Sequence, residues 1–148
     1  MWEKHKQKNA IRRAAARMAI DVRPTHFLTF SFGRRVRPEE GAALVEEFFK
    51  RADRAALGRN WYQFGATVRL AAVAFAEHLE SNIHWHAAVA VPLVQSTSAE
   101  CWAGLWSELS SHGQLHIELV SDEEAVAWYS TKATSSEENY ELMVVYAP

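Results

Sequence analysis

The spacing of apolar residues in the first part of the chain predicts a helix, a strand and a second helix. Residues 3–20 place apolar side chains at helical spacing against a strongly basic face, which indicates a helix. Residues 25–32, THFLTFSF, alternate and are rich in aromatic side chains, which is typical of a strand. Residues 38–57 again have helical spacing, with Pro38 near the first turn and Gly58 just past the end.

The later part of the chain predicts a hairpin followed by alternating helices and strands. Residues 66–78 suit a helix by their alanine content and a strand by their valines and phenylalanine, but the short link to the apolar run at 83–91 favours a β-hairpin. Capping boxes at 97–100 and 121–124 each predict the start of a helix, and the first helix should stop at Gly113. Further strands are predicted at 114–120 and 140–146.

This order of elements, α-β-α-β-β-α-β-α-β with a central hairpin, predicts the α+β class. We expect a central antiparallel sheet of about five strands, flanked by helices. A chain of 148 residues is most simply one domain with a proper core. We therefore expect a single domain over residues 1–148, with a basic N-terminal helix at 1–22 and the core at 23–148.

The amino-acid composition indicates a globular protein in a reducing compartment. Apolar residues make up 49% of the chain, as in an ordinary globular protein. No apolar run approaches the roughly 18 residues of a membrane span, so we expect no membrane partner. The single cysteine, Cys101, excludes an internal disulfide and suits a reducing compartment, which favours a cytoplasmic location.

Charge is divided unevenly along the chain. Residues 1–37 contain ten Lys and Arg against two acidic residues, a balance of +8, whereas the remaining residues have a balance of −10. Such an asymmetry predicts a basic segment that contacts a polyanion such as nucleic acid. The alternatives are a solvated helix face and an Arg- and Ala-rich transit peptide. The candidate DNA-binding residues are Arg12, Arg13, Arg17, Arg34 and Arg35.

Two histidines stand two positions apart at the start of the second strand of the predicted hairpin. Residues two apart in a strand share a face, so His84 and His86 point together and Trp85 points away. The simplest explanation is a pair of half-buried histidines that hydrogen-bond to their neighbours. The alternative is a pair of metal ligands, and this alternative depends on what lies opposite them.

The register of the hairpin decides which side chain joins the two histidines. A turn centred between residues 81 and 82 places Glu77 opposite His86, on the same face as His84. A slip of one position would bring His78 there instead. Two imidazoles and a carboxylate form a three-ligand site with open positions, as catalytic metals require. We therefore expect a divalent ion, Mn²⁺ or Mg²⁺.

Tyr129 and Lys132 form a second candidate pair, in the helix that follows the second capping box. Residues three apart share a helical face. Lys132 is also the only Lys or Arg after Arg69, so its position one turn beyond a tyrosine indicates a functional pair. The alternative is a surface lysine beside a tyrosine of the core.

Taken in order, these segments resemble the three motifs of the HUH endonuclease superfamily, and most closely its rolling-circle replication initiator (Rep) proteins of plasmids and phages. The histidine, bulky apolar, histidine motif corresponds to residues 84–86, and the tyrosine-x-x-lysine motif to Tyr129 and Lys132. Phe27, Leu28 and Thr29 stand where the first strand motif of the family belongs. The resemblance covers residues 26–134, about three quarters of the chain.

The resemblance implies a metal-dependent endonuclease that nicks and joins single-stranded DNA. Glu77, His84 and His86 would hold a divalent ion that polarises the scissile phosphate. Tyr129 would attack the phosphorus and form a 5′-phosphotyrosine, and Lys132 would neutralise charge on the phosphate or favour the tyrosinate. The substrate would be a replication origin, and the released 3′-hydroxyl would prime a host polymerase. The chain has no GxxxxGK[ST] phosphate loop, so a host helicase would open the duplex.

Several details of the motifs leave alternatives open. Ala133 stands where many relatives have a second tyrosine or another aromatic residue, so a two-tyrosine cycle is not expected. Small single-tyrosine HUH transposases share the size and motif order, although their tyrosine helix more often carries glutamine than lysine. Two histidines and a glutamate would also suit a zinc hydrolase. A non-catalytic origin-binding module is the remaining alternative.

Overall fold

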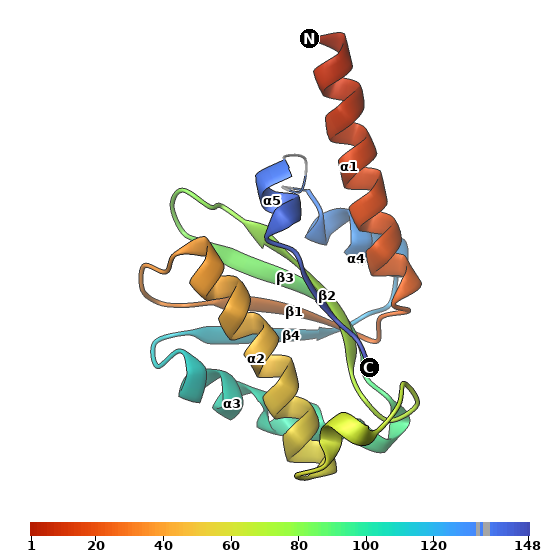
Figure 1. Cartoon of the computed structure of the whole chain (residues 1–148), viewed down its shortest axis with the longest axis vertical. Coiled ribbons are helices and arrows are strands. Elements are labelled where there is room, and N and C mark those ends of the chain that lie inside the picture. Colours follow the sequence, from red (N-terminus) through yellow and green to blue (C-terminus); the bar gives the residue numbers. More distant parts are fainter. Residues whose placement is uncertain (133, 135–136) are drawn as a thin grey trace.

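A computed structural model describes residues 1–132, 134 and 137–148 of the chain. Its sheet has five strands in the order β4-β1-β3-β2-β5, and every neighbouring pair is antiparallel (Figure 1). The predicted α+β class with an antiparallel sheet and flanking helices is therefore confirmed. The strands are β1 (His26–Ser31), β2 (Ala71–Glu77), β3 (His84–Ala90), β4 (Gln114–Leu119) and β5 (Val144–Tyr146). The helices are α1 (Trp2–Asp21), α2 (Pro38–Leu57), α3 (Trp102–Leu109), α4 (Glu123–Ser130) and α5 (Glu137–Glu141), with short 3₁₀ helices η1 (Trp61–Gln63), η2 (Leu93–Gln95) and η3 (Ser98–Cys101).

The central part of the chain has a simple topology. The run β1-α2-β2-β3-α3-β4, with the sheet order β4-β1-β3-β2, is a split βαβ (ferredoxin-like) arrangement. Helix α1 precedes this unit, and α4, α5 and β5 follow it. Strand β5 returns to pair with β2 and so extends the sheet at that edge.

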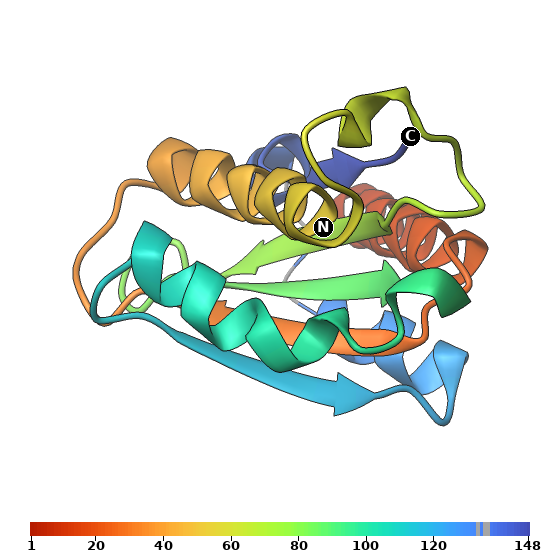
Figure 2. The same cartoon turned by 90° about the horizontal axis from the view of Figure 1, so that it is seen from below.

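Helices α2 and α3 cover one face of the sheet with a large aromatic core, as can be followed in Figure 2. Alternation directs Leu28, Phe30 and Trp85 to this face, and all three are fully buried. Helix α2 lies so close to the sheet that a Cβ at Gly41 would be 2.4 Å from the Trp85 ring. The sequence-based expectation that Trp85 points away from its two flanking histidines is confirmed.

The opposite face of the sheet is covered by α1 and α4 through small side chains. The buried residues of this second core are Ala15, Ala16, Ala19, Val73, Phe75, Ala88 and Ala127. The same alternation that places Val73 and Phe75 here also places Glu77 on this face, and Ala88 is in phase with His84 and His86. The candidate metal ligands therefore lie on the face with the smaller core.

Helix α1 is unusual because only its C-terminal half packs on the molecule. Its first nine residues, 2–10, are all exposed, and Figure 1 shows this half projecting beyond the sheet. Alanines at helical spacing in the other half allow close approach to α4 and β2. Among the described residues, no helix combines the length and the apolar character that crossing a membrane would require.

The two helices predicted from capping boxes both differ from expectation. The first is split into η3 and α3 and ends at Leu109, before Gly113, because the hydroxyl of Ser110 donates to the backbone of Phe32 and draws the chain toward the sheet. In the second, the N-cap is Asp122, whose carboxylate accepts from the Ala125 amide.

The closing strand is also shorter than predicted. It occupies Val144–Tyr146, and Tyr140, the first residue of the predicted strand, lies in α5. The Tyr146 hydroxyl donates to the buried carboxylate of Asp53. Tyr146 therefore has a structural partner inside the aromatic core.

Candidate functional site

The β2–β3 hairpin places the candidate ligands, in a register that differs from the predicted one. Glu77 lies opposite His84, two positions away from the predicted partner His86. The chain leaves β2 through His78, which has a φ of 56°, and then makes a turn over residues 78–81 that contains no glycine or asparagine. Because the shift is an even number of positions, all three side chains still share one face.

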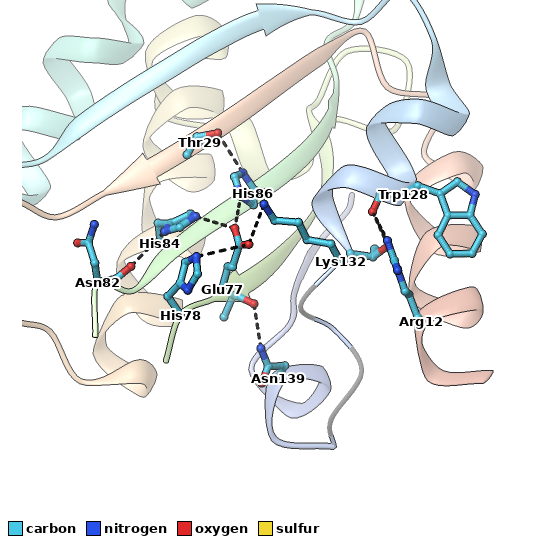
Figure 3. Close-up of polar contacts among 12 residues, drawn as sticks. Arg12, Thr29, Glu77, His78, Asn82, His84, His86, Trp128, Lys132 and Asn139 are labelled. Carbon is cyan, nitrogen blue, oxygen red and sulfur yellow. Dashed lines mark hydrogen bonds and ion pairs between the residues drawn. The ribbon is translucent and has the colours of Figure 1, made fainter. Parts of the chain in front are cut away.

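Glu77, His84 and His86 converge tightly on that face (Figure 3). The Glu77 Oε2 atom lies 2.7 Å from His84 Nε2 and 2.6 Å from His86 Nε2. Glu77 and His86 are buried, whereas His84 is partly open to solvent. One ligand atom from each residue lies within 4.8 Å of the others, so the group could hold a metal ion.

The outer nitrogens of both imidazoles are held by further hydrogen bonds. His84 Nδ1 lies 3.1 Å from the Asn82 carbonyl, which can only accept, so Nδ1 carries a proton and donates it. His86 Nδ1 lies 3.1 Å from the Thr29 hydroxyl. Such outer contacts orient metal-binding histidines and leave Nε2 for the ion. The donor set therefore fits a divalent metal.

The protonation states of the cluster also suit metal binding. Burial raises the pKa of Glu77, but hydrogen bonds from His86 and Lys132 outweigh it and lower the pKa to about 2. Burial lowers the pKa of His86 more than the neighbouring carboxylate raises it. At neutral pH the cluster thus offers an ionised carboxylate and a neutral imidazole, which are the metal-binding forms.

His78, the alternative third ligand, lies at the edge of the cluster. Its Nε2 is 3.6 Å from Glu77 Oε1, and its side chain is exposed because the turn carries it past the end of β2. Among the residues that the structure describes, the group able to hold a metal consists of Glu77, His84 and His86 without His78.

Tyr129 and Lys132 reach the same cluster from α4. Tyr129 lies in the last turn of α4, is 52% exposed, and its ring centroid is 5.3 Å from that of His86. Lys132 lies just past the helix end in a turn, and its Nζ is 3.1 Å from Glu77 Oε1 and 4.6 Å from the Tyr129 ring centroid. The hydrogen bond to Glu77 raises the pKa of Lys132, so the lysine is charged.

Several supporting residues were not selected as candidate ligands or catalytic residues from the sequence. Phe27 stacks on the His86 ring with centroids 5.4 Å apart and also contacts the Tyr129 ring edge-on. Asn139 of α5 donates to the Ala76 carbonyl, next to Glu77 (Figure 3). The position of Phe27 in the first strand motif was a usable signal, whereas no pattern in the sequence connects Asn139 with the hairpin.

An open groove runs beside Tyr129, between α4 and the sheet. Its cavity volume is about 460 Å³, and its lining residues are Phe27, Thr29, His116, Glu118, Ala125, Val126 and Tyr129. The groove gives an extended molecule access to the Tyr129 side chain from solvent. A somewhat larger cavity, of about 560 Å³, lies between α2, η1 and α3, on the other side of the sheet from the histidines.

The candidate DNA-binding arginines fall into two groups. Arg13 and Arg17 are exposed on α1, with Arg17 paired to Asp21 at 3.2 Å, whereas Arg12 is directed toward α4. The other group, Arg34 and Arg35, lies in the exposed loop after β1. Arg34 pairs with Glu40 at 2.8 Å, and Arg35 lines a groove shared with the tip of the β2–β3 hairpin.

Ala133, which the resemblance to HUH endonucleases compares with a second tyrosine, lies outside the described residues. Comparison of the chain with protein-family models, with curated proteins and with solved structures finds no match. The functional assignment therefore depends on the geometry of the site itself.

Proposed function

We propose that this protein is a metal-dependent endonuclease that nicks and rejoins single-stranded DNA through Tyr129, in the manner of the HUH replication initiators it resembles. One observation carries the proposal: the helix bearing Tyr129 brings Lys132 onto the same carboxylate that both histidines contact. A zinc hydrolase for small substrates would need the metal ligands but would leave this tyrosine and lysine without a role.

Glu77, His84 and His86 are the residues that would hold the ion. A divalent ion bound there supplies positive charge that polarises a non-bridging oxygen of the scissile phosphate. Imidazole ligands favour transition metals, so Mn²⁺ should bind more tightly than Mg²⁺. Thr29 and Asn82 keep the two rings oriented for this task through their contacts with the Nδ1 atoms.

Tyr129 is the nucleophile in this proposal. Its hydroxyl oxygen forms a bond to phosphorus while the bond from phosphorus to the 3′-oxygen breaks, in line with the attack. The tyrosine proton passes to solvent, and the leaving 3′-oxygen takes up a proton. The phosphodiester is conserved as a 5′-phosphotyrosine, so the reverse attack by a 3′-hydroxyl rejoins the strand without an energy source.

Lys132 contributes charge at the reacting phosphate. Its ammonium lies between the Tyr129 ring and Glu77, so a phosphate that reaches Tyr129 also comes near this cation. The lysine then stabilises negative charge that develops on the phosphate oxygens. The ion pair with Glu77 keeps the Lys132 ammonium beside the Tyr129 ring.

The proposed substrate is single-stranded DNA at a replication origin, with host helicase and polymerase acting before and after the nick. Single strands fit this site because Tyr129 opens to the groove beside α4, where an extended backbone can lie. The exposed arginines of α1 and of the loop after β1 would contact phosphates away from the chemistry.

Covalent trapping tests the proposal. The protein is incubated with Mn²⁺ and a pool of single-stranded oligonucleotides labelled at the 3′ end, and adducts are resolved on a denaturing gel. Attack by Tyr129 leaves the 3′ fragment on the protein, so a 3′ label should shift with the protein and a 5′ label should not. Tyr129→Phe should abolish the adduct, and Tyr62→Phe, another exposed tyrosine, should retain it. An adduct that survives in Tyr129→Phe would refute the assignment.

A further inference from the structure

One contact joins the basic N-terminal helix to the helix that carries the proposed nucleophile. The Arg12 guanidinium donates a hydrogen bond through its Nη2 to the backbone carbonyl of Trp128, at 3.0 Å (Figure 3). Trp128 immediately precedes Tyr129 in the last turn of α4. The contact spans 116 positions of sequence, so it links two elements that only the fold brings together.

Packing around this hydrogen bond makes it specific to arginine. The guanidinium carbon lies 4.8 Å from the centroid of the Trp128 ring, so the planar group stacks on the indole while it donates to the backbone. Arg12 is half-buried and its Nε is enclosed without a hydrogen-bond partner among the described residues, whereas the next residue, Arg13, is exposed. The two adjacent arginines therefore point to different sides of α1, Arg12 toward α4 and Arg13 toward solvent.

Helix α4 needs such an external contact. It has eight residues, and helices of this length are not stable in water without tertiary packing. Its last-turn carbonyls carry partial negative charge, which a cation at that end stabilises. The Ala127 carbonyl accepts from the backbone and side chain of Thr131, while the Trp128 carbonyl takes its charged donor from Arg12.

We propose that Arg12 is a positioning residue for Tyr129, holding the last turn of α4 against α1 so that the tyrosine hydroxyl stays aligned with the metal cluster. This inference rests on the proposed function. It also assigns α1 two tasks: Arg13 and Arg17 face solvent, where DNA can reach them, and Arg12 fixes the nucleophile. In-line attack tolerates little displacement, and about 1 Å of misplacement can cost on the order of 100-fold in rate.

The first test separates binding from chemistry. Single-turnover adduct formation is measured against DNA concentration for the wild type, Arg12→Ala, Arg12→Lys and Arg13→Ala. Arg12→Ala should lower the rate of adduct formation at saturating DNA by about 10- to 100-fold. The DNA concentration at half-saturation should change by less than about twofold. Arg12→Lys keeps the charge without the planar stack and should recover part of the rate. Arg13→Ala should instead weaken DNA binding. A higher half-saturation with an unchanged limiting rate in Arg12→Ala would make Arg12 a DNA contact and overturn the inference.

The second test needs no activity. Hydrogen exchange of the α4 amides should be faster by about tenfold in Arg12→Ala and unchanged in Arg13→Ala, because only the former loses a charged hydrogen bond to that helix. Equal exchange in both variants would refute the positioning role even where adducts form. If the wild type forms no adduct but exchange responds as expected, the contact stands and the proposed nickase fails. If Arg12→Ala does not fold, Trp128→Leu takes its place, because it removes the ring that Arg12 contacts at a position that is 44% exposed. This variant must then show slower adduct formation at saturating DNA and faster hydrogen exchange in α4.

Discussion

Replacing Glu77 with glutamine removes the charge at the centre of the metal cluster and nearly preserves the size of the side chain. In the wild type, Glu77 is 4% exposed, and its carboxylate accepts from His86 and Lys132 and lies 2.7 Å from His84 Nε2. An amide cannot satisfy a lysine ammonium and two imidazoles in the same way. We therefore expect Glu77→Gln to destabilise the protein even when no metal is present.

The size of the effect follows from the pKa of Glu77, which falls from its ordinary value of 4.5 to about 2. A shift of that size corresponds to roughly 3 kcal/mol in favour of the ionised form. Lys132 is 45% exposed, so solvent screens its share, and we expect about 2 to 3 kcal/mol. Because the folded-state pKa is lowered, this stability is fully present above about pH 4.5 and is lost as the pH falls toward 2.

Urea unfolding of metal-free protein at a series of pH values provides the assay. The difference in unfolding free energy between wild type and Glu77→Gln should be about 2 to 3 kcal/mol at pH 7 and should shrink toward zero near pH 2. Glu80→Gln is the matched control, since Glu80 is an exposed glutamate of the same hairpin and its substitution should change stability by less than about 0.5 kcal/mol. A difference for Glu77→Gln that is the same at pH 2.5 as at pH 7 would show that the carboxylate charge is not its source.

Three further predictions concern the metal, the basic helix and the packing of α2. The double variant His84→Ala/His86→Ala loses two of three donors, so calorimetry should show Mn²⁺ affinity reduced more than about tenfold, and equal affinities would contradict the site. A variant lacking residues 2–9, all exposed, loses three lysines, so the slope of log affinity for single-stranded DNA against log salt should flatten by about 2; an unchanged slope would mean that these lysines contact no phosphate. Gly41→Ala should lower the melting temperature, because its Cβ would lie 2.4 Å from an indole carbon, whereas Gly104→Ala has open space and should stabilise α3 by up to about 1 kcal/mol; the opposite order would refute the packing.

The sequence alone was informative about which side chains share a face. Alternation predicted that Glu77, His84 and His86 point together, and this held even though the predicted register was wrong by two positions. An even shift moves every partner along the strand without turning any side chain over. The register itself depended on the left-handed conformation of His78, a residue type that gives no strong signal for such a turn.

Other features depended on tertiary contacts that local patterns do not encode. Helix α3 ends at Leu109, where the Ser110 hydroxyl donates to the Phe32 carbonyl just after β1. Gly113 is a stronger helix-stop signal than Ser110, so the sequence predicted too late an end. Charge composition suggested that Arg12 faces DNA together with its neighbours. Its spacing of three, four and seven residues from Ala15, Ala16 and Ala19 was the better signal, because it places Arg12 on the buried stripe of the helix.

The unequal layers on the two sides of the sheet bear on how this protein can change over evolutionary time. The aromatic layer beneath α2 and α3 buries most of the large side chains, so it supplies most of the hydrophobic stabilisation. The alanine-rich layer beneath α1 and α4 buries little area per residue, and the reactive side chains stand at its margin. Under the proposed function, substitutions at the exposed residues of this margin, such as Tyr129, can alter the nucleophile at a small cost in stability, whereas substitution of the buried Glu77 costs more. A lineage can therefore diversify its chemistry on one side while the other side keeps the domain folded.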